Sequence, residues 1–248
     1  MKQTLNHTKA IYKRELGSYF NQLTAYIAIF IFLIFVMIMT FAVAQFMRVG
    51  DASLQYTFFY WHPLVYVLLV PIVGMRMWSD EHRSNTIELL GTFPISTWSA
   101  ILGKYLAAAT VWLAALALTF PIWITTNYLG DPDNVVIFSG YLGSFLTCLS
   151  FLAITSLVSS FSKDQVVTLV ISSFLCFLLF LLGFDQVARW IQTMAGEGLS
   201  EVFTATGVWD HFRSLNVGNF RLQDFVWFAT VISASLVGTN FILTSKRS

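Results

Sequence analysis

The side chains that could carry out chemistry in this 248-residue chain are few, and they avoid its long apolar segments. The sequence has 14 basic and 13 acidic residues, and the interiors of the apolar segments contain no Asp, Glu, Lys or Arg. Proton- or sodium-driven transport needs an ionisable or coordinating group near the middle of the membrane. An intramembrane enzyme needs a catalytic carboxylate or a pair of histidines. The pattern disfavours both classes.

The sequence offers no phosphate-binding loop of its own. Gly103-Lys104 is followed by Tyr105 rather than Ser or Thr, and no glycine precedes them at the required spacing. Any work that the protein performs must then be powered by a partner. His62 directly precedes Pro63, so we expect it to start a helix or to lie at the membrane interface rather than to relay protons.

Residues 76–98 form the most polar stretch on one side of the apolar segments. Charged residues flank Ile87 and Leu90, as in a small interface with a polar rim. Ser84 before these residues and a glycine after them predict a short helix, and Pro94 predicts an extended turn. The alternative is an ordinary solvated loop, which composition alone favours.

Composition places the chain in a membrane. Hydrophobic residues make up 56% and charged residues 11% of the sequence, whereas soluble domains have about 25% charged residues. The aromatic fraction of 17% is typical of lipid-facing surfaces. A soluble enzyme, a disordered chain and a disulfide scaffold are excluded, and a net charge of +1 gives no reason to expect nucleic acid as a partner. Cys148 and Cys176 lie in apolar runs and are expected to be small buried side chains.

Six segments are long and apolar enough for membrane-spanning helices, which need about 20 residues each. We therefore predict an all-α membrane protein with a single domain, residues 1–248. Ser96 is expected to cap the third helix and Pro121 to kink it. Gly140 and Gly143 are expected to permit close helix packing. The predicted spans are residues 23–46, 58–75, 99–125, 135–161, 166–184 and 225–244.

The basic residues are distributed unequally about these spans. Most of the 14 Lys and Arg residues lie on the side that carries both chain ends. Because cytoplasmic loops carry an excess of Lys and Arg, we expect both termini to be cytoplasmic.

Residues 1–21 are expected to form an amphipathic helix. Tyr12 and Leu16 belong to an apolar stripe at helical spacing, and Lys13 and Arg14 lie mostly off that stripe. Such a helix lies in the membrane plane, with its basic groups near anionic headgroups.

Residues 185–221 are too polar to span the membrane and too apolar for a free loop. Trp190 and Met194 belong to one apolar stripe, and Phe203 belongs to a second piece after a glycine-rich break. Two short re-entrant helices in the outer leaflet fit this pattern. Glu197 is expected to line a polar exit or, alternatively, to lie at a solvated tip.

The stretch from Glu81 to Ser96, followed by Leu102-Gly103-Lys104-Tyr105, resembles the signature of ABC-2-type transporter permeases. The shared features are an acidic and a basic residue, Ile-Glu-Leu-Leu, a Pro-Ile-Ser turn, and a Gly-Lys pair that opens the next helix. The chain is most similar to the gliding-motility-type permeases, which residues 211–225 also resemble. Asn85 departs from the pattern, because the family usually has Gly at that position.

This resemblance implies the architecture of a type V exporter. It makes residues 1–21 a connecting helix, places a coupling helix that docks on an ATP-binding subunit in residues 76–98, and places an external gate in residues 185–221. The ATPase-coupling residues are then Glu81, Arg83, Thr86, Ile87, Glu88, Leu90 and Pro94. The connecting-helix residues are Tyr12, Lys13, Arg14 and Leu16, and the gate candidates are Trp190, Met194, Glu197 and Phe203.

The implied function is that of a permease subunit without a catalytic site, in a bacterial inner membrane. ATP and Mg²⁺ would be bound by two copies of a separate ATP-binding subunit rather than by this chain. The chain would form a homodimer, or a heterodimer with a related permease, and a membrane subunit with a large extracytoplasmic domain would join them. Few polar groups in the first, second and fifth spans favour a lipidic or amphipathic substrate. The alternative is a mechanotransmitting subunit that relays ATPase motion to an extracytoplasmic partner without moving substrate.

Overall fold

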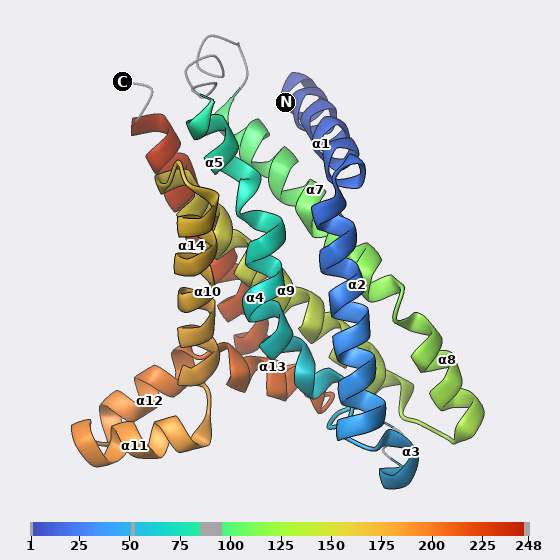
Figure 1. Ribbon diagram of the computed structural model, residues 1–248. Helices are drawn as coiled ribbons and strands as arrows, with labels where there is room; N and C mark the ends of the chain where they lie inside the picture. The colour runs from blue at the N-terminus through green and yellow to red at the C-terminus, as the bar shows by residue number, and fades with distance from the viewer. Residues whose placement is uncertain (1, 51–52, 85–95, 246–248) are drawn as a thin grey trace.

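The computed structural model describes residues 2–50, 53–84 and 96–245, and within these ranges the chain is helical and contains no strand (Figure 1). This confirms the predicted all-α class. The first elements are α1 (Lys2–Asn21), α2 (Leu23–Ile38), the π-helical η1 (Met39–Val43), α3 (Phe46–Val49), the 3₁₀ turn η2 (Phe59–Trp61), α4 (His62–Gly74) and α5 (Arg76–Arg83). The later elements are α7 (Thr97–Ala117), α8 (Phe120–Leu129), α9 (Asn134–Phe161), α10 (Gln165–Leu182), α11 (Asp185–Ala195), α12 (Glu197–Thr206), α13 (Val208–Asn216) and α14 (Leu222–Ser245).

Within the described residues, six helical stretches are long and apolar enough to cross a membrane, and they confirm the predicted spans to within a few residues at most of their ends. The second stretch is the most enclosed, whereas the first and the fifth turn most of their surface outward. The six stretches are Leu23–Arg48, Phe59–Arg83, Thr97–Leu129, Asn134–Phe161, Gln165–Leu182 and Leu222–Ser245.

The bundle has two distinct ends (Figure 1). One end carries α1, the end of α5, the start of α7 and the last turn of α14, so the two ends of the described chain lie on the same side. The opposite end carries α3, α11, α12 and α13. Which compartment each end faces remains a prediction.

Helix α9 lies at the centre of the bundle and packs against α4, α7, α10, α13 and α14. Its glycines allow this close packing, as predicted. A Cβ atom at Gly140 would lie 2.6 Å from ring atoms of Phe59, and one at Gly143 would lie 3.0 Å from Leu215 Cβ. A larger side chain at Gly140 would therefore force the ring and α9 apart.

The third span is broken rather than kinked at the predicted proline. Helix α7 ends at Ala117, and α8 begins at Phe120 with Pro121 in its first turn, where a missing backbone N–H costs nothing. The carbonyl of Thr119 accepts the backbone N–H of Ile122 at 3.0 Å and the hydroxyl of Tyr141 on α9 at 3.2 Å, so the break is tied to the central helix.

His62 is the first residue of α4, which confirms the predicted helix start. Its side chain is fully buried within the protein. Its Nδ1 atom lies 2.7 Å from Ser144 Oγ, and the Tyr66 hydroxyl lies 2.8 Å from the same oxygen. The hydroxyl on α9 therefore pairs with two polar groups of α4, whereas His62 Nε2 is buried without a hydrogen-bond partner among the described residues.

Candidate functional site

The structure describes only the two ends of the predicted coupling segment. Glu81 and Arg83 lie in the second half of α5, which ends at Arg83. Ser96 accepts the backbone N–H of Ser99 at 3.2 Å and caps α7, as predicted. The described residues exclude the expected short helix and the coupling candidates Thr86, Ile87, Glu88, Leu90 and Pro94.

A buried lysine occupies the junction just inside these two ends. Lys104 lies in the second turn of α7, and its side chain is only 7% exposed. Its Nζ atom lies 2.8 Å from Glu81 Oε1 on α5 and 3.5 Å from Glu15 Oε1 on α1. The ammonium group also lies 5.2 Å from the ring centroid of Trp78, a cation–π contact. We call these four residues the Lys104 cluster.

The Lys104 cluster joins three helices that are distant in the sequence: α1, α5 and α7. Removing a charge from water is costly unless an opposite charge compensates it. Each charged member of the cluster therefore depends on the others for its burial. Because removing one partner of a buried ion pair costs about 3–5 kcal/mol, the cluster fixes the relative positions of the three helices.

Hydrogen bonds to α9 hold α5 from its other side. Trp78 Nε1 donates to Ser156 Oγ at 3.1 Å, and the Trp78 backbone N–H donates to Ser159 Oγ at 2.9 Å. His82 Nε2 donates to the carbonyl of Ser160 at 2.8 Å. Helix α5 is thus attached both to the central helix and to the Lys104 cluster.

Helix α1 packs closely along α7. The hydroxyls of Tyr12 and Thr110 lie 3.0 Å apart. A Cβ atom at Gly103 would lie 2.8 Å from Ile11 Cγ2, so the glycine beside Lys104 lets the two helices touch. This contact brings Glu15 within reach of the Lys104 ammonium group.

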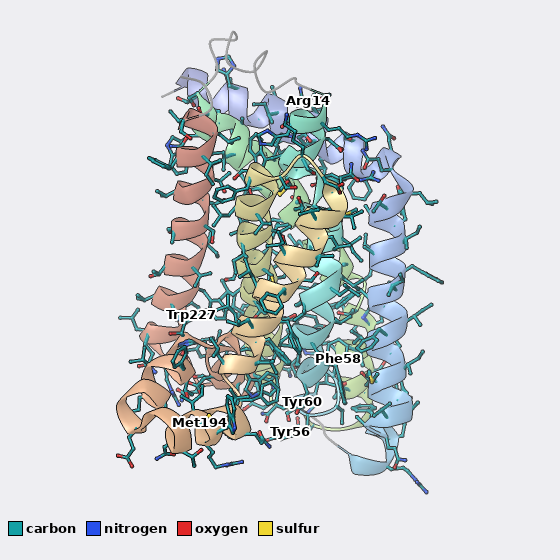
Figure 2. All side chains as sticks on the ribbon, turned by 60° about the vertical axis from the view of Figure 1, so that its left-hand side comes forward. Arg14, Tyr56, Phe58, Tyr60, Met194 and Trp227 are labelled. Carbon is teal, nitrogen blue, oxygen red and sulfur yellow. The ribbon has the colours of Figure 1, made fainter. Side chains whose placement is uncertain are left out.

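Residues Lys2–Asn21 form one helix, α1, and its place in the membrane plane stays a prediction. Tyr12 and Leu16 are half-buried, and Lys13 and Arg14 are exposed. Arg14, labelled in Figure 2 at the end of the bundle, lies 2.6 Å from Glu15 Oε1 and extends the Lys104 cluster to the surface.

Tyr19 continues the buried side of α1. Its hydroxyl donates to the carbonyl of Val73 at 3.5 Å. Burial raises the pKa of Tyr19 well above its ordinary value, and the nearby Glu15 acts in the same direction. The side chain therefore stays neutral and keeps its hydrogen bond to α4.

A cavity of about 180 Å³ adjoins the Lys104 cluster between α1, α5 and α7. Arg76 Nη1 donates to Gln22 Oε1 at 3.1 Å, and Gln165 Nε2 donates to the Asp80 carboxylate. Because its lining includes Arg76, Asp80 and the charged members of the Lys104 cluster, this space suits water rather than an apolar ligand.

The predicted gate candidates lie at the opposite end of the bundle. Helices α11 and α12 form a hairpin that projects sideways (Figure 1), divided at Gly196, whose φ is +90°. Trp190 and Met194 are 62% and 72% exposed, and Phe203 is also exposed. Glu197 accepts a hydrogen bond from Gln192 at 3.3 Å. The structure therefore has two short helices here, and their entry into the outer leaflet and their gating role stay predictions.

A third helix in residues 185–221 was missed by the sequence reasoning. The spacing of Val208, Phe212 and Leu215 indicates the buried face of α13. His211 on this helix places Nδ1 2.7 Å from Asp224 Oδ1 and Nε2 3.0 Å from the carbonyl of Ala205. This pair ties α13 to α12 and to the start of α14.

The Lys104 cluster was also missed. The sequence places Lys104 and Asp224 near the ends of spans, and the structure agrees on their positions but buries both side chains. A lone lysine within the apolar first turns of a helix was the available signal, because it requires an anionic partner. Its partner Glu15 could not be found from spacing, since the two residues belong to separate elements.

The described residues give little support for metal binding or cysteine chemistry. No group of three or more His, Cys, Asp or Glu side chains in residues 2–50, 53–84 and 96–245 could hold a metal ion. Cys148 and Cys176 are buried free thiols on α9 and α10, as expected for small apolar side chains.

Comparison with known proteins assigns the family. Residues 62–244 match the family model described as "ABC-2 family transporter protein", and this match covers more than half of the chain. No curated protein matches the sequence significantly. Six apolar helices and this match indicate a multi-pass membrane subunit of an ABC transporter. The chain belongs to the ABC-2 family of transporter proteins.

Proposed function

We propose that this chain is the permease subunit that receives the work of a separate ATP-binding subunit through residues 76–98. The proposal rests on one observation, which is that the Lys104 cluster joins α1, α5 and α7 at the two points where this segment leaves and re-enters the bundle. A displacement of residues 76–98 would then move all three helices together. In this account α1, α5 and α7 move as one body.

The attachments of α5 support this direction of transmission. Trp78 and His82 bind α5 to the central helix α9, and Lys104 binds α5 to α7. Displacement of α5 therefore has to displace the core of the bundle. The exposed Lys13 and Arg14 on α1 give a basic surface beside the segment, suited to an acidic patch on the ATP-binding subunit.

The family and the exposed faces also support a larger assembly. Helices α2 and α10 turn most of their apolar surface outward, which suits lipid and a second permease, identical or related. Two ATP-binding subunits bind ATP and Mg²⁺ in this assembly. The resemblance to gliding-motility-type permeases adds a membrane subunit with a large extracytoplasmic domain. The excess of Lys and Arg at the end with the termini supports cytoplasmic termini in a bacterial inner membrane. The few polar groups in the first, second and fifth spans support export of a lipidic or amphipathic substrate.

Affinity purification of the full chain from its native membrane in mild detergent tests the proposal. An ATP-binding subunit is expected to co-purify, with ATPase activity that depends on the permease. Glu88→Lys is expected to leave the chain folded and to uncouple the ATPase activity from transport, whereas Lys163→Glu in the exposed loop before α10 is the matched control. A purified complex that contains no ATP-binding subunit would contradict the proposal.

A further inference from the structure

His211 forms a hydrogen bond at each of its two ring nitrogens, and the proposed coupling function uses neither. Its side chain lies on α13 and is 8% exposed. Nδ1 lies 2.7 Å from Asp224 Oδ1 on α14, and Nε2 lies 3.0 Å from the carbonyl oxygen of Ala205 on α12. The imidazole also stacks on the indole of Trp227 with ring centroids 4.7 Å apart, and Figure 2 labels Trp227 at the same end of the molecule as Met194. His211 therefore connects α12, α13 and α14.

The two contacts of His211 require two protons. A carbonyl oxygen can only accept a hydrogen bond, so Nε2 carries the proton that it donates to Ala205. Nδ1 and the Asp224 oxygen also need a proton between them, because two lone pairs 2.7 Å apart would repel each other. A neutral histidine beside an ionised carboxylate has only one proton. The pair therefore holds one additional proton, and its net charge is zero, which suits the complete burial of Asp224.

Few other charged groups surround His211. Helices α9 and α10, which pack against α13, contain no Asp, Glu, Lys, Arg or His, and their titratable side chains are Tyr141, Cys148 and Cys176. Within the described residues, only Asp224 forms an ion pair with His211. The proton on the pair therefore depends mainly on that carboxylate. The other charged residues of α12, α13 and the turn before α14 are Glu197, Glu201, Asp210, Arg213 and Arg221, of which Asp210 is half-buried and the rest are exposed.

Loss of the additional proton leaves one hydrogen bond where there were two. A hydrogen bond to a carboxylate is roughly twice as strong as one between neutral groups, so the remaining proton stays between His211 and Asp224. Nε2 then presents a lone pair to the carbonyl of Ala205, and the contact between α13 and α12 becomes repulsive. That carbonyl lies in the last turn of α12, where backbone carbonyls lack a partner inside the helix.

The α11–α12 hairpin meets the bundle at two glycines. A Cβ atom at Gly207 would lie 2.1 Å from the backbone nitrogen of Gly183, so the chain segments that enter and leave the hairpin touch through their backbones. Ser200 Oγ donates to the carbonyl of Ala188 at 2.9 Å and holds α12 on α11. The hairpin can therefore change its angle to the bundle as one unit when its contact with His211 is lost.

We propose that the His211–Asp224 pair is a proton-dependent switch that holds the α11–α12 hairpin against the bundle. The protonated pair binds the end of α12, and loss of its additional proton as the pH rises releases that end. Phe184 stacks on Trp209 with ring centroids 4.9 Å apart and keeps the start of α11 in place. The end of α12 is therefore the part that moves.

Distances between spin labels on the full chain in lipid nanodiscs test this assignment. One label replaces Val202, which is 62% exposed on α12, and the other replaces the exposed Asn219 after α13. The distance distribution is expected to be narrow in mildly acidic buffer and to broaden as the pH is raised. A second pair of labels, at Asn219 and the exposed Asp131, lies outside the hairpin and should give the same distance throughout.

Two variants separate the switch from other effects of pH. In Asp224→Asn the amide can donate to Nδ1 while Nε2 keeps its proton for Ala205, so a neutral histidine makes both bonds. This variant is expected to keep the narrow distribution at every pH. His211→Gln is expected to give the broad distribution at every pH, because it lacks the second ring nitrogen. His7→Gln on α1 is the matched control and should respond to pH as the unmodified chain does.

Three results would overturn the assignment. The first is a Val202–Asn219 distribution in the unmodified chain that does not change with pH. The second is a pH response that persists in Asp224→Asn or in His211→Gln. The third is an equal change between the labels at Asn219 and Asp131, which would mean that the whole bundle loosens. If one variant does not fold, the unmodified chain and the other variant still decide the question.

Discussion

The two ends of the bundle hold their buried charges in different ways. At the end with the chain termini, Lys104 pairs with Glu15 and Glu81, which belong to two other helices far away in the sequence. At the opposite end, His211 lies 2.7 Å from Asp224, which follows it across a single turn. The first arrangement fixes the relative positions of three helices that are distant in the sequence. The second joins two consecutive helices, α13 and α14. We therefore expect the first to govern movement of the bundle and the second to govern local folding.

The largest effect is expected for Lys104→Met, which keeps the apolar stem but removes the charge. Two buried carboxylates lose their cation, so the free energy of unfolding should fall by about 3–5 kcal/mol. Thermal unfolding in detergent measures this loss. Lys13→Met, at an exposed position of α1, is the control and should change stability by about 0.5 kcal/mol or less. Equal losses of stability in the two variants would show that the Lys104 cluster contributes no more than an exposed lysine does.

Asp224→Asn should have a smaller and more local effect. The change weakens the hydrogen bond between residue 224 and His211, and the Asp224 side chain is fully buried. A hydrogen bond to a charged group contributes about 1.5–3 kcal/mol. Unfolding should show a loss in this range while the permease-dependent ATPase activity persists. Asp131→Asn in an exposed loop is the control. A loss of ATPase coupling in Asp224→Asn would show that this pair, too, transmits movement.

Trp78→Phe tests the contribution of the indole to the Lys104 cluster. The change removes the N–H that donates to Ser156 and weakens the cation–π contact with Lys104. The expected loss of stability is about 1 kcal/mol. Trp98→Phe, at a partly exposed position at the start of α7, serves for comparison. If Trp78→Phe is as stable as Trp98→Phe, the indole only fills space.

The smallest effect is expected for Arg213→Gln. Its pair with Asp185 is exposed on both sides, and exposed ion pairs typically contribute about 0.2–1 kcal/mol. Unfolding of Arg213→Gln should therefore be nearly the same as that of the unmodified chain. A loss of stability as large as that of Lys104→Met would show that the exposed Arg213–Asp185 pair also stabilises the bundle strongly.

Most of the framework could be predicted from the sequence because it depends on local patterns. Long apolar runs set the six spans, Ser96 caps α7 as its position before an apolar helix indicates, and Gly140 marks a close approach. Pro121 predicted a disturbance in the third span, and the structure has a full break there. Helix α13 was missed because its apolar spacing extends over only nine residues, between Gly207 and Gly218.

The candidate site could be predicted only in part. The resemblance directed attention to Glu81 and Arg83, but the structure adds Lys104 and Glu15, whose contact depends on how α1 lies along α7. A long-range ion pair of this kind leaves no trace in spacing. His62 was expected at a helix start or an interface, and only the position of Ser144 on another helix shows why it is buried.

The central claim, that α1, α5 and α7 move as one body, is tested most directly by a distance measurement. Spin labels at the exposed positions Lys13 and Arg83 report on α1 and α5, and the native cysteines are buried. In the complex with the ATP-binding subunit, the distance between the labels should stay the same when ATP is added, and in Lys104→Met it should shift or broaden. An ATP-dependent shift in the unmodified chain as large as that in Lys104→Met would contradict the account.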